Sequence, residues 1–240
     1  MSPEQSDQPD LPTPPDQASK ASERPESKAS PPTVWSWLVV NTLGFAIAIA
    51  LLVLLGFQFS GRELFLAGLV ISAIVGAVQA IVLRQKMLRL RIWQWVLVSI
   101  LGSYLGVFLG LVATFLLSTF GLLILVLIPF AELFVGTLLG TMVGVCVGFG
   151  QVLVLARQVR GLRWWWVANV LGRSLGWLSA QLLWQLVKAE TVIMVPPNSI
   201  QDLPIVLLCG AVGGLVYGGV TARALPLLTA RQPAITNSQK

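Results

Sequence analysis

Long apolar runs separated by short polar loops dominate the chain from residue 35 onward. Six of these runs approach or exceed the roughly 20 apolar residues that an α-helix needs to cross a bilayer. They lack a polar face, so a soluble helical bundle does not explain them. The pattern predicts an all-α integral membrane bundle of six transmembrane helices. The predicted spans are residues 35–57, 64–83, 92–117, 133–156, 164–187 and 203–222.

The regions outside the spans have a different composition. Residues 1–34 hold eight prolines and six acidic residues but no apolar run, which predicts a disordered, Pro-rich cytoplasmic tail. The transmembrane domain is expected over 35–226, followed by a short cytoplasmic tail over 227–240. The apolar segment 120–130 is too short to span and predicts an interfacial or re-entrant piece.

Basic residues concentrate on one side of the predicted membrane. The loop 84–91 holds four and the loop 157–163 holds three, while the opposite loops hold only Arg62 and Lys188. Positive loops stay in the cytoplasm, which places both termini there. We therefore expect a multi-pass protein of a bacterial inner or internal membrane, with anionic lipids as partners at its cytoplasmic face.

Tryptophan gives a second signal for the same orientation. Seven of the nine tryptophans lie in the first turn of an odd-numbered span, where indole rings favour the headgroup level. Arginine–tryptophan mixtures also bind single-stranded nucleic acid, but each cluster here abuts a span, so no nucleic acid is expected. The predicted interface anchors are Trp35, Trp37, Trp93, Trp95, Trp164, Trp165 and Trp166.

An internal repeat is visible in the spans. The odd-numbered spans align as Trp37–Asn41–Gly44, Trp95–Ser99–Gly102 and Trp165–Asn169–Gly172. The even-numbered spans align on Gly76–Gln79, Gly148–Gln151 and Gly214–Tyr217. The predicted unit is a helical hairpin repeated three times.

Two sequence segments carry a resemblance to a known family. GAVQAIVLR at 76–84 and GFGQVLVLAR at 148–157 each precede a basic loop and a Trp-rich helix start. They resemble a bacterial family of polytopic membrane proteins with repeated GxxxGxxQxxVLR motifs. The likeness covers residues 35–223 and departs in the last span, where Tyr217 replaces glutamine. The resemblance implies a membrane fold and no particular activity.

Glycines recur every fourth position, which places them on one face of a helix where backbones can approach closely. Packing within the molecule is favoured over a dimer interface. The predicted packing glycines are Gly102, Gly106, Gly136, Gly140, Gly144, Gly148, Gly172, Gly176, Gly210 and Gly214.

The fifth predicted span carries a basic side chain well inside the membrane. Arg173 lies nine residues beyond Trp164, or about 13 Å along the helix. Asn169, Gln181 and Gln185 share its broad polar stripe. Intramembrane charges often mark ligand sites, pathways or pairs, but arginine can also extend to the interface, and both interpretations stay open.

Two glutamines form a second candidate polar group. Gln79 and Gln151 lie about two turns from the cytoplasmic ends of their helices. We favour hydrogen bonds between helices over contact with a substrate for both.

The function remains open between two classes. The chain has no histidine and two cysteines, and it shows no nucleophile beside a base, so we expect no catalytic residues, no metal and no cofactor. The favoured function is a non-enzymatic scaffold or assembly and interaction factor with a possible membrane protein partner. The alternative is a small-solute or ion transporter or channel with a pathway near Arg173.

Overall fold

The computed structural model describes residues 34–57, 62–87, 90–119, 131–188 and 202–230. This part of the chain is almost wholly helical, as predicted, and the helix ends fall within three residues of the predicted spans. The helices are α1 (Val34–Leu54), α2 (Arg62–Lys86), α3 (Ile92–Thr119), α5 (Ala131–Leu155), α6 (Leu162–Lys188) and α7 (Leu203–Ala222). Three predicted segments lie outside the described residues: the tail before Val34, the segment 120–130 and the residues after Ala230.

Five of these helices are long and apolar enough to cross a membrane, which supports a multi-pass membrane protein. The exception is α6, which has 27 residues but carries Arg163 and Arg173 together with several amide side chains. Polar groups on its inner face, such as the fully buried Asn169, lower its hydropathy. Length alone would allow α6 to span a bilayer as well.

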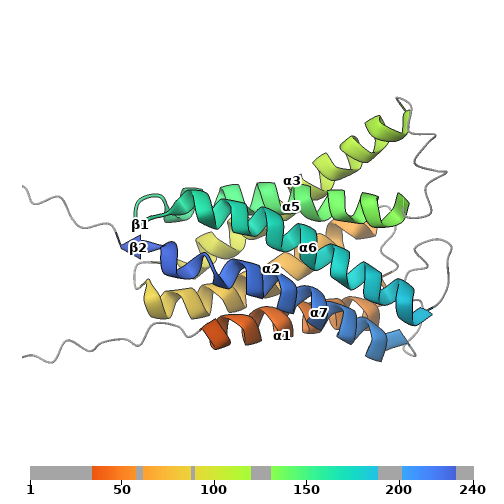
Figure 1. Ribbon diagram of the computed structural model, residues 1–240, viewed down its shortest axis with the longest axis horizontal. Coiled ribbons are helices and arrows are strands. Elements are labelled where there is room, and N and C mark those ends of the chain that lie inside the picture. The colour runs from red at the N-terminus through yellow and green to blue at the C-terminus, as the bar shows by residue number, and fades with distance from the viewer. Residues whose placement is uncertain (1–33, 58–61, 88–89, 120–130, 189–201, 231–240) are drawn as a thin grey trace, which may run out of the picture. The chain divides into compact units, whose positions relative to one another are not determined.

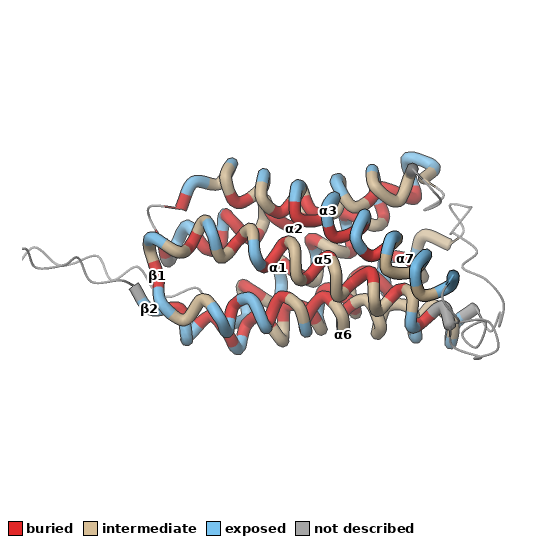
Figure 2. The backbone as a smooth tube through the Cα atoms, turned by 90° about the horizontal axis from the view of Figure 1, so that it is seen from above, coloured by how far each residue is buried: buried red, intermediate tan, exposed pale blue. Residues whose placement is uncertain are grey.

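The helices run side by side along the long axis of the bundle (Figure 1), and each packs against the next to form a closed ring. The order is α1, α2, α3, α5, α6 and α7, and α7 packs against α1 to close the ring. Buried residues follow one side of each helix, while the other side is exposed (Figure 2). The exposed side is rich in leucine and phenylalanine, as a lipid-facing surface requires.

Glycines allow the neighbouring helices of the ring to touch. An added Cβ at Gly102 would lie 2.7 Å from the Cα of Val147, and one at Gly176 would lie 2.7 Å from the carbonyl oxygen of Gly213. Such distances leave no room for a side chain. The structure places all ten predicted packing glycines against an adjacent helix of the same chain.

One end of the bundle carries a short structure that the sequence did not suggest. Strand β1 (Val159–Arg160) pairs antiparallel with β2 (Thr229–Ala230), which follows the 3₁₀ turn η2 (Leu225–Leu227). Gly161 follows β1 with a φ of 84°, which favours glycine. The predicted tail from residue 227 therefore begins with ordered chain, and Leu228 is buried.

A candidate functional site in the centre of the ring

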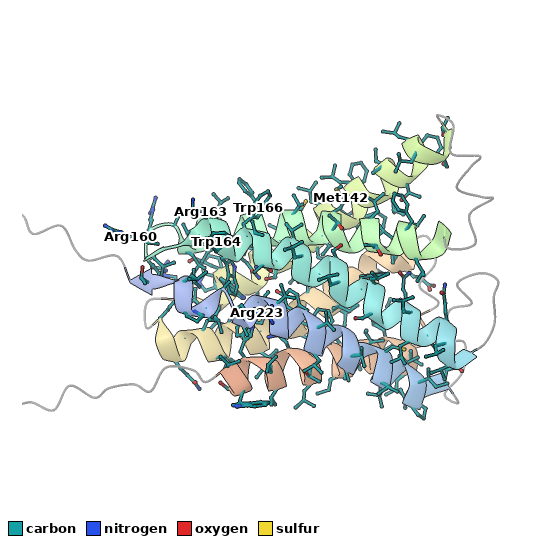
Figure 3. The ribbon with its side chains drawn as sticks, viewed as in Figure 1. Met142, Arg160, Arg163, Trp164, Trp166 and Arg223 are labelled. Carbon is teal, nitrogen blue, oxygen red and sulfur yellow. The ribbon has the colours of Figure 1, made fainter. Side chains whose placement is uncertain are left out.

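We call the end of the bundle that carries β1 and β2 the basic end. The C-terminal ends of α2, α5 and α7 and the N-terminal ends of α3 and α6 meet there. Figure 3 shows Arg160, Arg163 and Trp164 at this end, where the guanidinium carbon of Arg163 lies 5.3 Å from the centre of the Trp164 ring. The basic end matches the side that the sequence predicts to be cytoplasmic.

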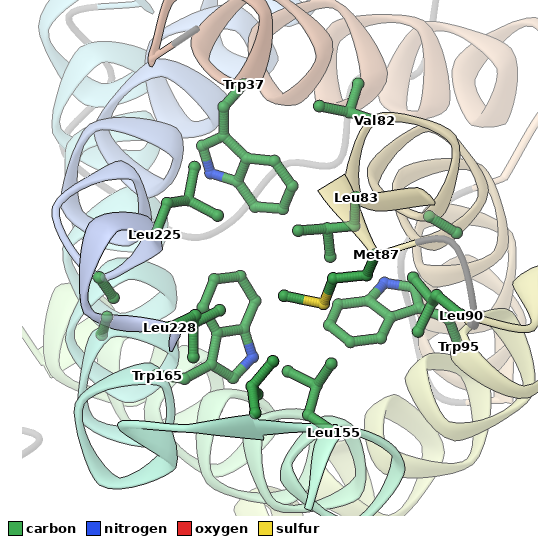
Figure 4. Packing of buried hydrophobic residues seen from close by; sticks show 14 of the residues in the cluster. Trp37, Val82, Leu83, Met87, Leu90, Trp95, Leu155, Trp165, Leu225 and Leu228 are labelled. Atoms are coloured by element: carbon green, nitrogen blue, oxygen red, sulfur yellow. The ribbon is translucent and has the colours of Figure 1, made fainter. Parts of the chain in front are cut away.

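Three tryptophans close the centre of the ring at the basic end (Figure 4). Trp165 meets Trp37 at a ring-centroid distance of 5.7 Å and Trp95 at 6.0 Å. All three side chains are fully buried. We call this the indole plug; apolar side chains surround it, among them Leu83, Met87, Leu155, Leu225 and Leu228.

The indole plug corrects part of the predicted set of interface anchors. Trp37, Trp95 and Trp165 contact protein and not headgroups, because their helix positions face the centre of the ring. The other four are exposed, as an anchor requires: Trp35, Trp93, Trp164 and Trp166. Paired tryptophans at a helix start thus serve two purposes, one facing outward and the other inward.

Directly beyond the plug lies a hydrogen-bonded layer that draws one polar side chain from each helix. We call it the polar belt. In its first half, the amide nitrogen of Gln79 donates to the Oδ1 of Asn41 at 2.7 Å and to the hydroxyl of Tyr217 at 3.3 Å. The Tyr217 hydroxyl donates to the Oδ1 of Asn169 at 2.8 Å. The belt consists of Asn41, Gln79, Ser99, Gln151, Asn169 and Tyr217.

The second half of the belt joins α3, α5 and α6. The Trp165 indole N–H donates to the Oε1 of Gln151 at 3.1 Å, and the Gln151 amide donates to the hydroxyl of Ser99 at 3.2 Å. The Asn169 amide donates to the backbone carbonyl of Trp165 and so connects the two halves. Gln79, Gln151 and Asn169 therefore act between helices, since each makes at least one hydrogen bond to a side chain of another helix.

Two groups at the belt have no partner among the described residues. They are the Oε1 of Gln79, an acceptor, and the indole N–H of Trp95, a donor. Between α5 and α6 the same two types of group, in Gln151 and Trp165, bond to each other. The belt is thus less completely satisfied at α2 and α3 than at α5 and α6.

Arg173 lies one helical turn beyond the belt and is 92% buried, having a relative exposure of 8%. Its guanidinium carbon lies 5.3 Å from the centre of the Tyr217 ring and 6.0 Å from that of Phe45. Its Nε has no hydrogen-bond partner among the described residues. The side chain therefore points into the protein and does not extend toward the headgroups.

The two aromatic rings explain how the cation is tolerated without an acidic partner among the described residues. A desolvated cation–π contact contributes about 2 kcal/mol or more. An arginine near the middle of a bilayer costs about 3 kcal/mol on insertion scales. Tyr217 and Phe45 together offset a penalty of this size, although Phe45 lies at the outer limit of the useful distance. Arg173 is thus held by aromatic faces from two different helices.

The remaining predicted polar residues lie farther from the belt. The side chain of Gln181 packs against Gly136 of α5, and its Oε1 has no partner in the described part of the chain. Gln185 is half-buried, one turn farther along α6. Neither residue is brought to the belt, and the stripe predicted along α6 divides into a bonded part at Asn169 and a less satisfied part from Arg173 onward.

On the last helix, Thr221 makes a hydrogen bond that parallels that of Gln151. Trp37 donates to the hydroxyl of Thr221 at 2.9 Å, and Trp165 donates to the Oε1 of Gln151. Tyr217, which the alignment matched to the two glutamines, lies with them in the polar belt. Thr221 follows Gly218 by three residues, as Gln151 follows Gly148.

The contacts of Gly148 and Gly218 are also alike. An added Cβ at Gly148 would lie 2.9 Å from the Cβ of Asn169, and one at Gly218 would lie 3.0 Å from the Cβ of Asn41. Gly218 thus occupies on α7 the place that Gly148 occupies on α5.

Comparison of the chain with protein-family models, curated proteins and solved structures finds no match.

Proposed function

We propose that the chain is a six-span, non-enzymatic membrane protein that acts as a scaffold or assembly factor. The observation that carries this proposal is the closed centre of the ring: the indole plug fills it at the basic end, and the polar belt ties all the helices together behind the plug. Buried polar groups that bond to one another make a rigid body and leave few groups for a substrate. A rigid body with an apolar outer surface suits the binding of other membrane proteins.

We further propose that the ring consists of three related hairpins, α1–α2, α3–α5 and α6–α7. Equivalent contacts support this proposal: Gly76 approaches the Cβ of Ser99 as Gly148 approaches that of Asn169. In both cases an even-position helix meets the first helix of the next hairpin. A related set of hairpins explains why the ring closes with α7 against α1.

A transporter or channel is the second candidate, and one observation favours it. Arg173 has an unpaired Nε, and the buried hydroxyl of Ser72 and the Oε1 of Gln181 also have no partner among the described residues. Unsatisfied buried groups are uncommon and often belong to functional sites. A small anion bound near Arg173 would accept a hydrogen bond from its Nε.

The topology is tested by cysteine labelling in a background with Cys146→Ala and Cys209→Ala. Arg157→Cys, between β1 and α5, should react only from the cytoplasmic side. Asn198→Cys, between α6 and α7, should react only from outside. Both reacting from the same side would show that α6 does not cross the bilayer and would remove the six-span proposal.

The choice between scaffold and transporter is tested by purified protein in sealed liposomes. A scaffold should leave the leak of chloride, phosphate and small carboxylates equal to that of protein-free liposomes. In the native host, deletion of the gene should remove at least one membrane complex on native gels, and Arg173→Leu should restore it. Solute flux that Arg173→Leu abolishes would instead establish the transporter.

A further inference from the structure

A groove of about 850 Å³ lies on the outer surface of the ring at the basic end, where α2 ends and α3 begins. Charged side chains line one end, and apolar side chains line the rest. The residues used below are Arg84, Arg91, Trp93, Val96, Leu97 and Ile100.

The charged end of the groove holds two arginines that nothing in the described chain neutralises. Arg84 and Arg91 are both exposed, and neither guanidinium has an ion pair or a hydrogen bond among the described residues. Arg163, at the same end of the bundle, differs because it lies over the ring of Trp164. Two free guanidinium groups at one groove favour a ligand with a phosphate, which arginine binds with paired hydrogen bonds.

Along α3, in the direction of the predicted bilayer normal, the lining of the groove changes from charged to apolar side chains. Arg91 and Ile100 are nine residues apart, which corresponds to about 13 Å of helix. Val96, Leu97 and Ile100 provide an apolar wall over that distance. Trp93 is exposed beside the charged end, at the level where indole rings meet headgroups. A soluble anion would use only the charged end of such a surface.

We propose that this groove is a specific binding site for a phospholipid with an anionic headgroup. The phosphate lies between Arg84 and Arg91, the Trp93 ring borders the headgroup, and one acyl chain follows Val96, Leu97 and Ile100. The sequence suggests anionic lipids for the whole cytoplasmic face, and the groove assigns one of them to a defined place. The site does not depend on whether the protein is a scaffold or a transporter.

The test compares two charge-matched double variants of the full chain in detergent micelles. Arg84→Gln with Arg91→Gln removes the charged end of the groove. Arg157→Gln with Arg160→Gln removes two exposed arginines at the basic end that do not line it. Both variants lower the net charge from +6 to +4 (6 − 2 = 4). The binding of phosphatidylglycerol, phosphatidylcholine and inorganic phosphate is measured by titration and by native mass spectrometry.

The expected result is specific loss in the groove variant. Each arginine near a membrane surface contributes about fivefold to the binding of an anionic lipid, so the double change should weaken phosphatidylglycerol binding roughly thirtyfold. The Arg157 and Arg160 variant should keep most of the binding. Ile100→Trp, which fills the apolar part, should weaken lipid binding while both arginines remain.

Three outcomes would overturn the proposal. Equal losses in the two double variants would show a diffuse charge effect. Equal binding of phosphatidylcholine would show that the headgroup charge is irrelevant. Inorganic phosphate that displaces the lipid at comparable concentration would show a site for a soluble anion.

Discussion

The centre of the ring has two layers that differ in how their polar groups are satisfied. One is the polar belt, and the other, the Arg173 layer, begins one helical turn beyond it. At the polar belt, six side chains from six helices bond to one another, and only the Oε1 of Gln79 remains open among their described side-chain atoms. One turn farther on, Arg173 relies on the faces of Tyr217 and Phe45, and its Nε has no described partner. Both layers are buried, so burial alone does not distinguish them.

This difference indicates which layer stabilises the fold and which layer is available for another role. A buried group that is already paired stabilises the fold and cannot be changed without leaving its partner unsatisfied. A buried group without a partner contributes less to the fold, and its removal can even be favourable. Substitutions in the belt should therefore destabilise the protein, whereas the Arg173 layer should tolerate substitutions. The following substitutions test that contrast, from the largest expected effect to the smallest.

The largest effect is expected where backbones touch behind the belt. Gly144→Leu would place a side chain where an added Cβ already lies 2.8 Å from the Cα of Val170 and 2.8 Å from the carbonyl oxygen of Asn169. Overpacking of this kind costs about 3 kcal/mol or more. The free energy of unfolding in mixed micelles measures it. The matched control is Gly219→Leu, where the nearest atom is 3.9 Å away, and it should cost less than half as much.

A smaller loss is expected from the belt itself. Gln151→Leu leaves the indole N–H of Trp165 buried without an acceptor, which costs about 2 kcal/mol. Gln181→Leu is the comparison in the Arg173 layer. Because the amide oxygen of Gln181 has no described partner, this substitution should change the free energy of unfolding of the protein by less than about 0.5 kcal/mol. Equal losses of unfolding free energy for Gln151→Leu and Gln181→Leu would contradict the difference between the belt and the Arg173 layer.

The indole plug offers a finer comparison. Trp165→Phe removes a donor and leaves the Oε1 of Gln151 unpaired, whereas Trp95→Phe removes an N–H that has no described partner. Both changes remove similar ring volume. Trp165→Phe should therefore destabilise the protein by about 1 kcal/mol more than Trp95→Phe. Thermal unfolding of the two variants in one detergent gives the difference, and a reversed order would contradict the hydrogen-bond assignment.

The smallest effect on folding is expected at the buried cation. Arg173→Leu removes a desolvated charge and replaces it with an apolar side chain, so stability should stay within about 1 kcal/mol of the original or increase. Arg173→Lys keeps the charge but lacks the planar face that stacks on Tyr217, and it should be the less stable of the two. A large loss of folded protein in the leucine variant would show that Arg173 has a structural partner.

The sequence predicted the helices well because apolar runs of bilayer length have few alternative structures. It also identified the belt residues Gln79, Gln151 and Asn169, since amides inside apolar helices require partners. It did not separate the inward Trp165 from the outward Trp164, because adjacent residues differ only in helical angle. The strand pair at Val159 and Thr229 was missed because two residues carry no periodic signal.

The sequence also did not predict which side chains lie beside the Arg173 guanidinium. Tyr217 and Phe45 lie on α7 and α1, far from Arg173 along the chain, and only the closure of the ring brings them together. An inspection limited to its own helix finds Asn169 and Gln181, and neither side chain is hydrogen-bonded to the guanidinium in the described structure. The aromatic faces that hold a buried cation are thus a property of the tertiary fold.

Water access to the centre tests the central claim most directly. In the background without Cys146 and Cys209, Ser99→Cys reports on the belt and Ser103→Cys on the turn beyond it, because both serines are buried on α3. Leu55→Cys and Arg157→Cys are exposed controls at opposite ends. A closed, dry centre predicts that a small charged methanethiosulfonate reagent, present on both sides of the membrane vesicles, modifies both controls and neither serine position. Rapid modification of Ser103→Cys from either side would reveal a hydrated path to the Arg173 layer and contradict the closed centre.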